Sequence, residues 1–171
     1  MVISIYNYAE IVIRRAELAE VDIIKKIIKD AYAAIKKQLS RSPGAMNESL
    51  SKISREIQMG NQYVALVGNN VVGCMRVNLS GQNGVISRIA VLTTYRNRRV
   101  GTMLIEYGEN LLEHSNATTI EIEVYGAVEE QKEFYEKLGY EEIERTRRGK
   151  EEIVVMRKSL IEDEIVDDDD Y

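Results

Sequence analysis

The sequence of 171 residues is 44% hydrophobic and 30% charged, which suits one folded domain with its own core. Its formal net charge of −5 comes from the end of the chain. The last eleven residues contain seven acidic side chains and no basic one, so residues 1–160 alone carry +2. This near-neutral body argues against a general nucleic-acid binder, whose basic face would dominate the count, but leaves room for one local basic site.

Cysteine and histidine are each present once, as Cys74 and His114. A disulfide within the chain is therefore excluded, and we expect no metal site, because a zinc cluster needs several such ligands. We find no apolar run of the ~18 residues that a membrane span needs and no basic start typical of a signal peptide. We therefore expect a cytoplasmic protein with no membrane contact.

The first third of the chain predicts a strand at residues 11–14 and then an amphipathic helix over 24–35, where isoleucines recur at helical spacing between lysines. Residues 40–47, SRSPGAMN, contain the only proline and predict a loop. Its last residue, Asn47, is a suitable N-cap for a second helix.

Three β-rich runs follow, at residues 62–67, 71–77 and 84–91. The first two are separated by GNN, a sequence that accepts positive φ and therefore closes a hairpin. Together the three runs predict an antiparallel meander.

The second half of the chain alternates between helices and strands. From Asn97 the apolar residues recur at helical spacing until about Ser115. In TIEIEVYG, residues 119–126, apolar and acidic residues alternate, which predicts a strand with Glu121 and Glu123 on one face. The last predicted elements are a helix over 128–138 that ends at Gly139 and a hairpin of strands 140–146 and 151–158.

No internal repeat or second domain is visible, so we expect a single domain over residues 1–160. Residues 161–171 form an acidic segment that cannot bury apolar surface. We expect a disordered, solvating tail there, with a docking peptide or an oligomer contact as the alternatives.

The stretch IAVLTTYRNRRVGT, residues 89–102, joins a predicted strand to a helix start. The first turn of a helix has N–H groups without intrahelical partners and about half a positive charge. Arg96, Arg98 and Arg99 add full charges there, and Gly101 allows close approach to the backbone. This pattern fits a pyrophosphate, with a solvated surface as the alternative, although neither a P-loop nor a GxGxxG sequence is present.

Residues 134–140 read FYEKLGY at the end of a helix, and with them the chain resembles the GNAT superfamily of acetyl-coenzyme-A-dependent N-acetyltransferases. The resemblance covers most of residues 11–158 and is sharpest from Ile86 to Tyr140. IAVLTTYRNRRVG resembles the strand and pyrophosphate loop of that family, Q/R-x-x-G-x-G/A, and FYEKLGY resembles its tyrosine helix. The order and spacing of the two motifs make the match specific.

The resemblance implies an α/β fold of the α+β type. Its central sheet would be mixed and mostly antiparallel, with about seven strands flanked by about four helices. The fourth and fifth strands would splay apart and open a wedge in which acetyl-CoA and an acceptor amine meet.

The resemblance also assigns residues to acetyl-CoA. Tyr135 would contact the cofactor and act as general acid toward its sulfur, while a backbone N–H near Ile89 would hold the developing oxyanion. The remaining contacts implied are Ile89, Ala90 and Val91 for the pantetheine arm and Arg96, Asn97, Arg98, Arg99, Val100, Gly101 and Thr102 for the pyrophosphate.

The general base is less well defined by the sequence. Glu123 is the first candidate and Glu121 the second, acting directly or through water, and two exposed strand carboxylates are the alternative. Ser87 and Arg88 occupy the stretch where some relatives carry a catalytic glutamate. For Tyr135 the alternative is a purely structural tyrosine on the apolar face of its helix.

Three residues depart from the family pattern. Arg99 stands where the loop has its first glycine, so a left-handed backbone at this position would be strained. Val128 and Gln131 replace the asparagine and alanine that the family often has, and a side-chain contact to the pantetheine would then be missing.

The first functional prediction is therefore direct acetyl transfer from acetyl-CoA to a primary amine: a protein N-terminus, a lysine, a polyamine or another small amine. Residues 32–46 and 145–150 match the segments that set specificity in relatives. The alternatives are an acetyl-CoA-binding sensor or partner module without turnover, and nucleic-acid binding through the arginines, which we do not expect. The resemblance also allows a homodimer.

Overall fold

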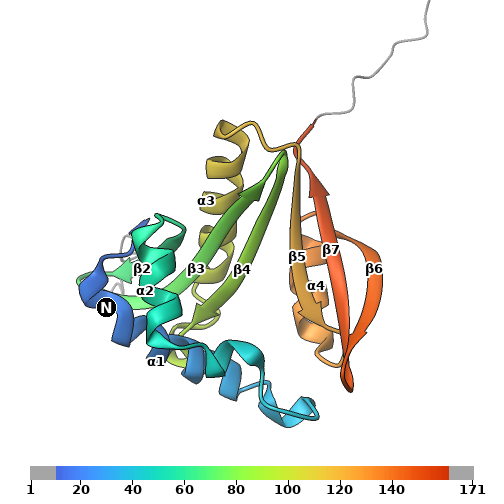
Figure 1. Cartoon of the computed structure of the whole chain (residues 1–171), viewed down its shortest axis with the longest axis horizontal. Coiled ribbons are helices and arrows are strands. Elements are labelled where there is room, and N and C mark those ends of the chain that lie inside the picture. The colour runs from blue at the N-terminus through green and yellow to red at the C-terminus, as the bar shows by residue number, and fades with distance from the viewer. Residues whose placement is uncertain (1–10, 162–171) are drawn as a thin grey trace, which may run out of the picture.

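The computed structural model describes residues 11–161, and these residues form one mixed sheet with helices on both faces (Figure 1). The predictions that concern residues 1–10 and 162–171, including nearly all of the acidic tail, lie outside the described residues. The strands are β1 (Ile11–Arg15), β2 (Gln62–Val67), β3 (Asn70–Ser80), β4 (Asn83–Val91), β5 (Thr119–Tyr125), β6 (Glu141–Arg148) and β7 (Glu151–Ser159). The helices are α1 (Val21–Ala33), α2 (Leu50–Gln58), α3 (Val100–His114) and α4 (Glu129–Lys137), and the short 3₁₀ turns are η1 (Leu18–Glu20), η2 (Lys36–Gln38), η3 (Gly44–Asn47) and η4 (Thr93–Tyr95).

The strand order is β1-β2-β3-β4-β5-β7-β6, and every neighbouring pair is antiparallel except β4 and β5. This parallel pair is hydrogen-bonded only at its start, where residues 83–85 of β4 face residues 119–121 of β5. Beyond that point the two strands diverge, and Figure 1 shows them meeting at one end and well separated at the other. The predicted mixed, seven-stranded, splayed sheet is confirmed.

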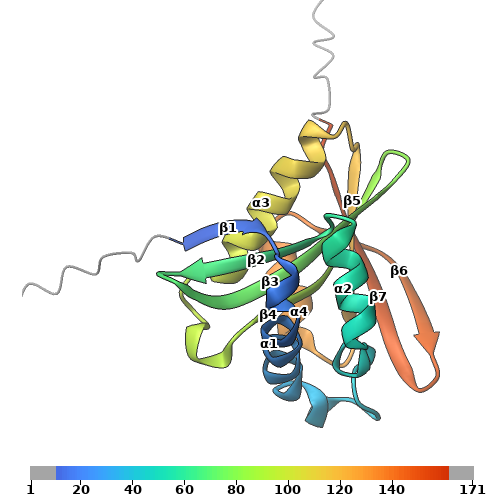
Figure 2. The ribbon, with the colours of Figure 1, turned by 60° about the vertical axis from the view of Figure 1, so that its left-hand side comes forward.

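The helices cover the sheet in two pairs, as Figure 2 shows from a second side. Alternation along the strands explains this arrangement: Tyr63 and Met75 face the core beneath α3 and α4, whereas Val64 and Cys74 face α1 and α2. The middle of the sheet is therefore buried on both faces, with α1 and α2 on one face and α3 and α4 on the other, whereas the edge strand β6 is exposed.

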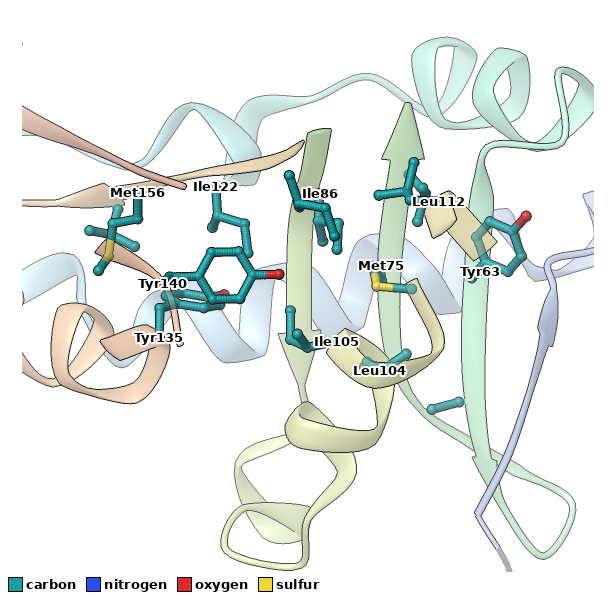
Figure 3. Packing of buried hydrophobic residues seen from close by; sticks show 14 of the residues in the cluster. Tyr63, Met75, Ile86, Leu104, Ile105, Leu112, Ile122, Tyr135, Tyr140 and Met156 are labelled. Atoms are coloured by element: carbon teal, nitrogen blue, oxygen red, sulfur yellow. The ribbon is translucent and has the colours of Figure 1, made fainter. Parts of the chain in front are cut away.

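The larger core extends across the splayed sheet and includes the tyrosines that come from the end of α4 (Figure 3). Tyr135 and Tyr140 pack edge to face, with ring centroids 5.8 Å apart. Gly108 lets α3 lie close to β4, because a Cβ there would come within 2.9 Å of Ile86 Cδ1. This packing holds α3 and α4 on either side of the splay.

Several predicted boundaries shift. Helix α1 starts three residues earlier than expected and ends before Ile35. The N-cap of α2 is Ser49, not Asn47: the Ser49 hydroxyl accepts a hydrogen bond from Lys52 N at 3.1 Å, whereas Asn47 ends the turn η3. Helix α3 begins at Val100, three residues after the predicted start. Gly139, at φ +94°, ends α4 as predicted.

Within residues 11–161, none of the helices has the length and apolar character that crossing a membrane requires.

Candidate active site

The splay between β4 and β5 opens into a cavity of about 640 Å³. Its walls come from α1, β4, the start of α3 and α4. A cavity of this size suits a small organic ligand. Ten of the residues predicted to bind acetyl-CoA line it: Ile89, Ala90, Val91, Arg96, Asn97, Arg99, Val100, Gly101, Thr102 and Tyr135.

Arg98 is the one predicted cofactor residue that does not line the cavity. Its guanidinium lies over the ring of Tyr95, 5.2 Å from the centroid. A cation–π contact of this kind anchors the loop without pointing the charge inward.

The middle of β4 contains a β-bulge at the cavity. On β3, Cys74 pairs with Ala90 and Arg76 pairs with Ser87, so the two β4 residues between them face a single β3 residue. One of these two, Arg88, has φ +51°. A bulge leaves backbone groups outside the ladder and redirects side chains. The other bulge residue is Ile89, next to the predicted oxyanion site.

The loop between β4 and α3 ends in a left-handed N-cap. Arg99 has φ 65° and ψ 7°, and its side chain makes no capping hydrogen bond. The first hydrogen bond that closes the helix is Met103 N to Arg99 O, at 2.9 Å. Within residues 11–161, the N–H groups of residues 100–102 have no partner, so the start of α3 presents three free donors at the cavity.

Three hydrogen bonds attach this loop to α1, one of which the Thr93 hydroxyl donates to Asp30 Oδ1 at 3.5 Å. Arg96 Nη2 donates to the Ala31 carbonyl at 3.1 Å, and Thr93 N donates to Asp30 Oδ2 at 2.8 Å. Arg96 therefore has a structural contact while it also lines the cavity.

Gly101 lies where the cavity meets the start of α3. A Cβ at this position would be in ordinary contact with Phe134 Cζ, at 3.6 Å, and with Val91 Cγ2, at 3.9 Å. Packing within the chain therefore does not require glycine here, which is consistent with a ligand lying against the backbone.

Tyr135 is the buried aromatic side chain that α4 contributes to the cavity. It is 8% exposed and packs against Phe134, with ring centroids 5.0 Å apart. Burial, and to a smaller extent the phenol of Tyr32, raise the pKa of Tyr135 above its usual value. The phenol is therefore protonated at neutral pH and can donate a proton.

About half of the chain matches a known protein family. Residues 59–142 match the family model described as the acetyltransferase (GNAT) domain, which covers β2 to the start of β6. This match identifies residues 59–142 as a GNAT acetyltransferase domain. A search of curated proteins gives no match.

Solved GNAT structures share the fold at low sequence identity. The PaiA N-acetyltransferase of Thermoplasma acidophilum, solved in complex with coenzyme A, is 14% identical, with a TM-score of 0.78 over 88% of this chain and 99% of that one. Ard1 of Thermoplasma volcanium is 19% identical, with a TM-score of 0.71 over 89% and 99%. The ribosomal-protein-S18-alanine N-acetyltransferase of Escherichia coli is 17% identical, with a TM-score of 0.73 over 91% and 99%.

The two departures on the α4 side of this GNAT site have visible consequences. Val128 is buried and lines the cavity just before α4. Gln131 also lines the cavity, and its Oε1 accepts a hydrogen bond from Tyr125 N at 3.1 Å. Part of the Gln131 side chain therefore ties α4 to β5.

Neither predicted general base lines the cavity. Glu123 accepts a hydrogen bond from Arg148 Nη2 at 2.6 Å, and Glu121 accepts one from Arg157 Nε at 3.1 Å. Both carboxylates are on the same face of β5 as Tyr125, as the alternation predicts. That face turns toward the α1 and α2 side of the wedge.

Tyr32 is a cavity residue that the sequence analysis did not single out as a site residue. It lies on α1 and lines the cavity from the wall opposite α4. Burial raises the pKa of Tyr32 to about 12, and the positive charge of Arg88 opposes this rise. The available signal was a phenol at position i+4 from Ile28, on the apolar face of the helix.

A buried ion cluster lies beside the wedge, between η3 and the sheet. The carboxylate of Glu48 accepts from Arg76 Nη1 at 3.1 Å and Nη2 at 2.5 Å, and from Arg88 Nε at 3.2 Å. The side chains of Glu48 and Arg76 are 8% and 6% exposed. The cluster fixes the segment before α2 to β3 and β4.

A second contact spans the open end of the wedge, where Figure 1 shows the segment between α1 and α2 reaching toward the β6–β7 hairpin. Glu151 accepts hydrogen bonds from Ser40 N at 2.6 Å, from Arg41 N at 3.3 Å and from the Ser40 hydroxyl. We call this contact the loop–hairpin bridge. It joins the segment between α1 and α2 to the start of β7.

No group of three or more histidine, cysteine, aspartate or glutamate side chains within residues 11–161 is arranged to hold a metal ion.

Proposed function

We propose that the protein is an N-acetyltransferase that transfers the acetyl group of acetyl-CoA directly to a primary amine. One observation carries this proposal: a single cavity in the β4–β5 splay has the free N-terminus of α3 at one end and the protonated phenol of Tyr135 in its wall. These are an anion site and a proton donor, the two groups that a charged thioester cosubstrate requires.

The residues of the cavity fit acetyl-CoA part by part. The three free N–H groups of residues 100–102 and the guanidinium groups of Arg96 and Arg99 are suited to the pyrophosphate. The cavity-lining stretch of β4, residues 89–91, can bind the pantetheine arm as an added strand would, along its backbone. The PaiA relative was solved with coenzyme A, which supports this assignment.

The chemistry needs little more than positioning and two proton transfers. The neutral amine attacks the thioester carbonyl, an N–C bond forms, and the C–S bond breaks. Tyr135 gives its proton to the departing sulfur, and the backbone N–H of Ile89 at the bulge stabilises the oxyanion. The amine loses its proton to a base, which we propose to be Glu123. Arg148 holds the Glu123 side chain outside the cavity, so the proton would pass through a water molecule.

The second candidate is a domain that binds acetyl-CoA as a sensor or partner module without turnover. The hydrogen bond of Gln131 to β5 favours this second candidate. The engaged side chain is less available to hold the pantetheine in the position that transfer requires.

The test is coenzyme A release measured against a panel of peptides, polyamines and amino acids. We expect at least one class to be acetylated, and Tyr135→Phe to lower kcat by about 100-fold, the usual contribution of a general acid, with the dissociation constant for acetyl-CoA little changed. Glu123→Gln should lower kcat in the same way if Glu123 is the base.

Tyr140→Phe is the matched control, because the Tyr140 hydroxyl is buried without a hydrogen-bond partner in residues 11–161 and Tyr140 does not line the cavity. This variant should keep the wild-type kcat. Tight acetyl-CoA binding in calorimetry with no coenzyme A release from any amine would establish the sensor instead.

A further inference from the structure

Arg88 is an unusual residue at the point where cofactor and acceptor should meet. It is next to Ile89 in the β4 bulge, past the last paired residue of the β4–β5 ladder. Its φ of +51° is a backbone conformation that residues other than glycine rarely adopt. Strain of this kind persists where the surrounding structure enforces it, and it is common at functional sites.

The contacts of Arg88 leave part of its guanidinium free. Only Nε is engaged, with Glu48 at 3.2 Å, and within residues 11–161 neither terminal nitrogen has a hydrogen-bond partner. Glu48 is already held by both terminal nitrogens of Arg76. Two guanidinium groups therefore share one carboxylate, and the cluster keeps a net charge of +1.

The side chain of Arg88 contacts Glu48 on the α1 and α2 side of the sheet; Arg88 does not itself line the cofactor cavity, but the next residue, Ile89, does. Burial raises the pKa values of Tyr32 on α1 and Tyr125 on β5, and in both cases the charge of Arg88 is the strongest opposing influence. Tyr32 also lines the cofactor cavity, whereas Tyr125 lies on the far strand. Arg88 is 34% exposed in this position, so a small ligand can reach it.

The carboxylates on this side of the wedge already have partners. Glu151 accepts from Ser40 and Arg41 in the loop–hairpin bridge, and Glu123 accepts from Arg148. A polyamine would bring a second cation to a place where Glu151 and Glu123 are already engaged and the Glu48 cluster is net positive. An acceptor with its own carboxylate would instead bring a negative charge to this net positive cluster.

We infer that Arg88 is a specificity-determining residue that binds a carboxylate carried by the acceptor a few bonds from its amine. The terminal nitrogens of its guanidinium would bind that carboxylate as a fork, and this would direct the amine toward the thioester near Ile89. The acceptor class is then an aminocarboxylate, either a free amino acid or a peptide with an acidic first residue. This inference rests on the proposed acetyl transfer.

The experiment compares acceptors with and without a carboxylate beside the amine, each at the same concentration of neutral amine. Alanine is paired with alaninamide, and a peptide that begins with aspartate is paired with the same peptide beginning with asparagine. In the wild-type protein the acid should exceed its amide in kcat/KM by about 10-fold or more in at least one pair, as expected for a charge-assisted pair. The pair that shows the preference identifies the source of the carboxylate.

Arg88→Gln should abolish the preference and leave the KM for acetyl-CoA within about twofold of wild type, whereas Arg88→Lys should retain part of it. Arg14→Gln is the control: Arg14 is an equally exposed arginine paired with one glutamate, but it lies on β1, away from the wedge. This variant should keep the full preference.

Two results would overturn the inference: amides acetylated as well as acids by the wild type, or an equal loss for both members of a pair in Arg88→Gln. Absence of acetylation with every amine would reject the proposed function instead. In that case, calorimetry of acceptor binding to the coenzyme A complex tests the Arg88 site by itself. The inference is supported if the acids bind, the amides do not, and Arg88→Gln abolishes binding of the acids. It is rejected if acid and amide bind equally or if neither binds.

Discussion

Arg99 combines a charge that suits the cofactor with a backbone conformation that suits glycine. Its φ of 65° places it in the left-handed region, where an L side chain is strained by about 1 kcal/mol or more. The sequence indicated that an arginine here would be strained in this conformation, and the structure shows that the position adopts it nevertheless. The gain is a guanidinium at the cavity, next to the three free N–H groups of α3.

This balance predicts different effects of two substitutions at the same position. Arg99→Gly and Arg99→Ala both remove the guanidinium, but only alanine keeps the Cβ that causes the strain. We expect the glycine variant to have a free energy of unfolding about 1 kcal/mol higher than the alanine variant, measured by urea denaturation.

Both variants should raise the KM for acetyl-CoA by the same factor, because they lose the same charge, and this comparison is the internal control. Equal stability of the glycine and alanine variants would show that the left-handed backbone at Arg99 stores no strain.

Local motifs explain which single residues were predictable. Gly101 and Tyr135 each lie in a short motif, and the structure brings both to one cavity. Arg88 and Tyr32 are 56 positions apart and no local motif links them, because only the packing of α1 on β4 brings them together. The N-cap of α2 was misplaced for a different reason: Asn47 and Ser49 are both good caps, and the chain turns at η3 before the helix begins.

At the scale of elements, the loop–hairpin bridge is the contact that joins the two halves of the splayed sheet at the open end of the wedge. On one side are Ser40 and Arg41, in the loop after η2, and on the other is Glu151 at the start of β7. The sequence predicted a loop at residues 40–47 but could not indicate its partner, because the two segments are 110 positions apart.

The bridge should weaken as the pH falls. The hydroxyl of Ser40 is the strongest influence that holds the pKa of Glu151 below its ordinary value; burial opposes it, and the N–H groups of Ser40 and Arg41 add to the lowering. Because the folded-state pKa of Glu151 lies below the unfolded-state pKa, the bridge contributes its full stability at pH values above the unfolded-state pKa of about 4.3. This contribution is lost as the pH falls through the folded-state pKa. We expect hydrogen-exchange protection of the Ser40 and Arg41 amides to drop below about pH 4.

Glu151→Gln should remove the pH dependence of these two amides and lower their protection at neutral pH. Glu142→Gln serves as the control, since Glu142 also pairs with cations but lies on β6, in contact with Lys132 and Arg145. If protection at Ser40 stays constant down to pH 3 in the wild type, Glu151 does not hold the loop.

At the scale of the whole molecule, hydrophobic periodicity was sufficient for the elements but not for their arrangement. The strict alternation of β5 and the helical spacing of α3 were both readable. The parallel pairing of β4 with β5 over three residues was not, since periodicity carries no strand order. The family resemblance implied a mixed sheet and a splay between the fourth and fifth strands, but it did not specify this pairing. The wedge, and with it the site, follows from that one short pairing.

The distribution of charge over the whole chain gives the last prediction. Residues 161–171 change the net charge of the protein from +2 to −5, and coenzyme A carries several negative charges. The long-range field of seven added acids opposes its approach to the start of α3. A chain that ends at Leu160 should therefore bind acetyl-CoA about two- to fivefold more tightly in ~20 mM salt, and the difference should vanish at ~0.5 M salt, where the Debye length is a few ångströms.

A variant of full length with every acid of this segment replaced by its amide separates charge from length, because it should bind as the shortened chain does. Equal affinity of all three proteins in low salt would mean that the acidic segment exerts no field at the cofactor site.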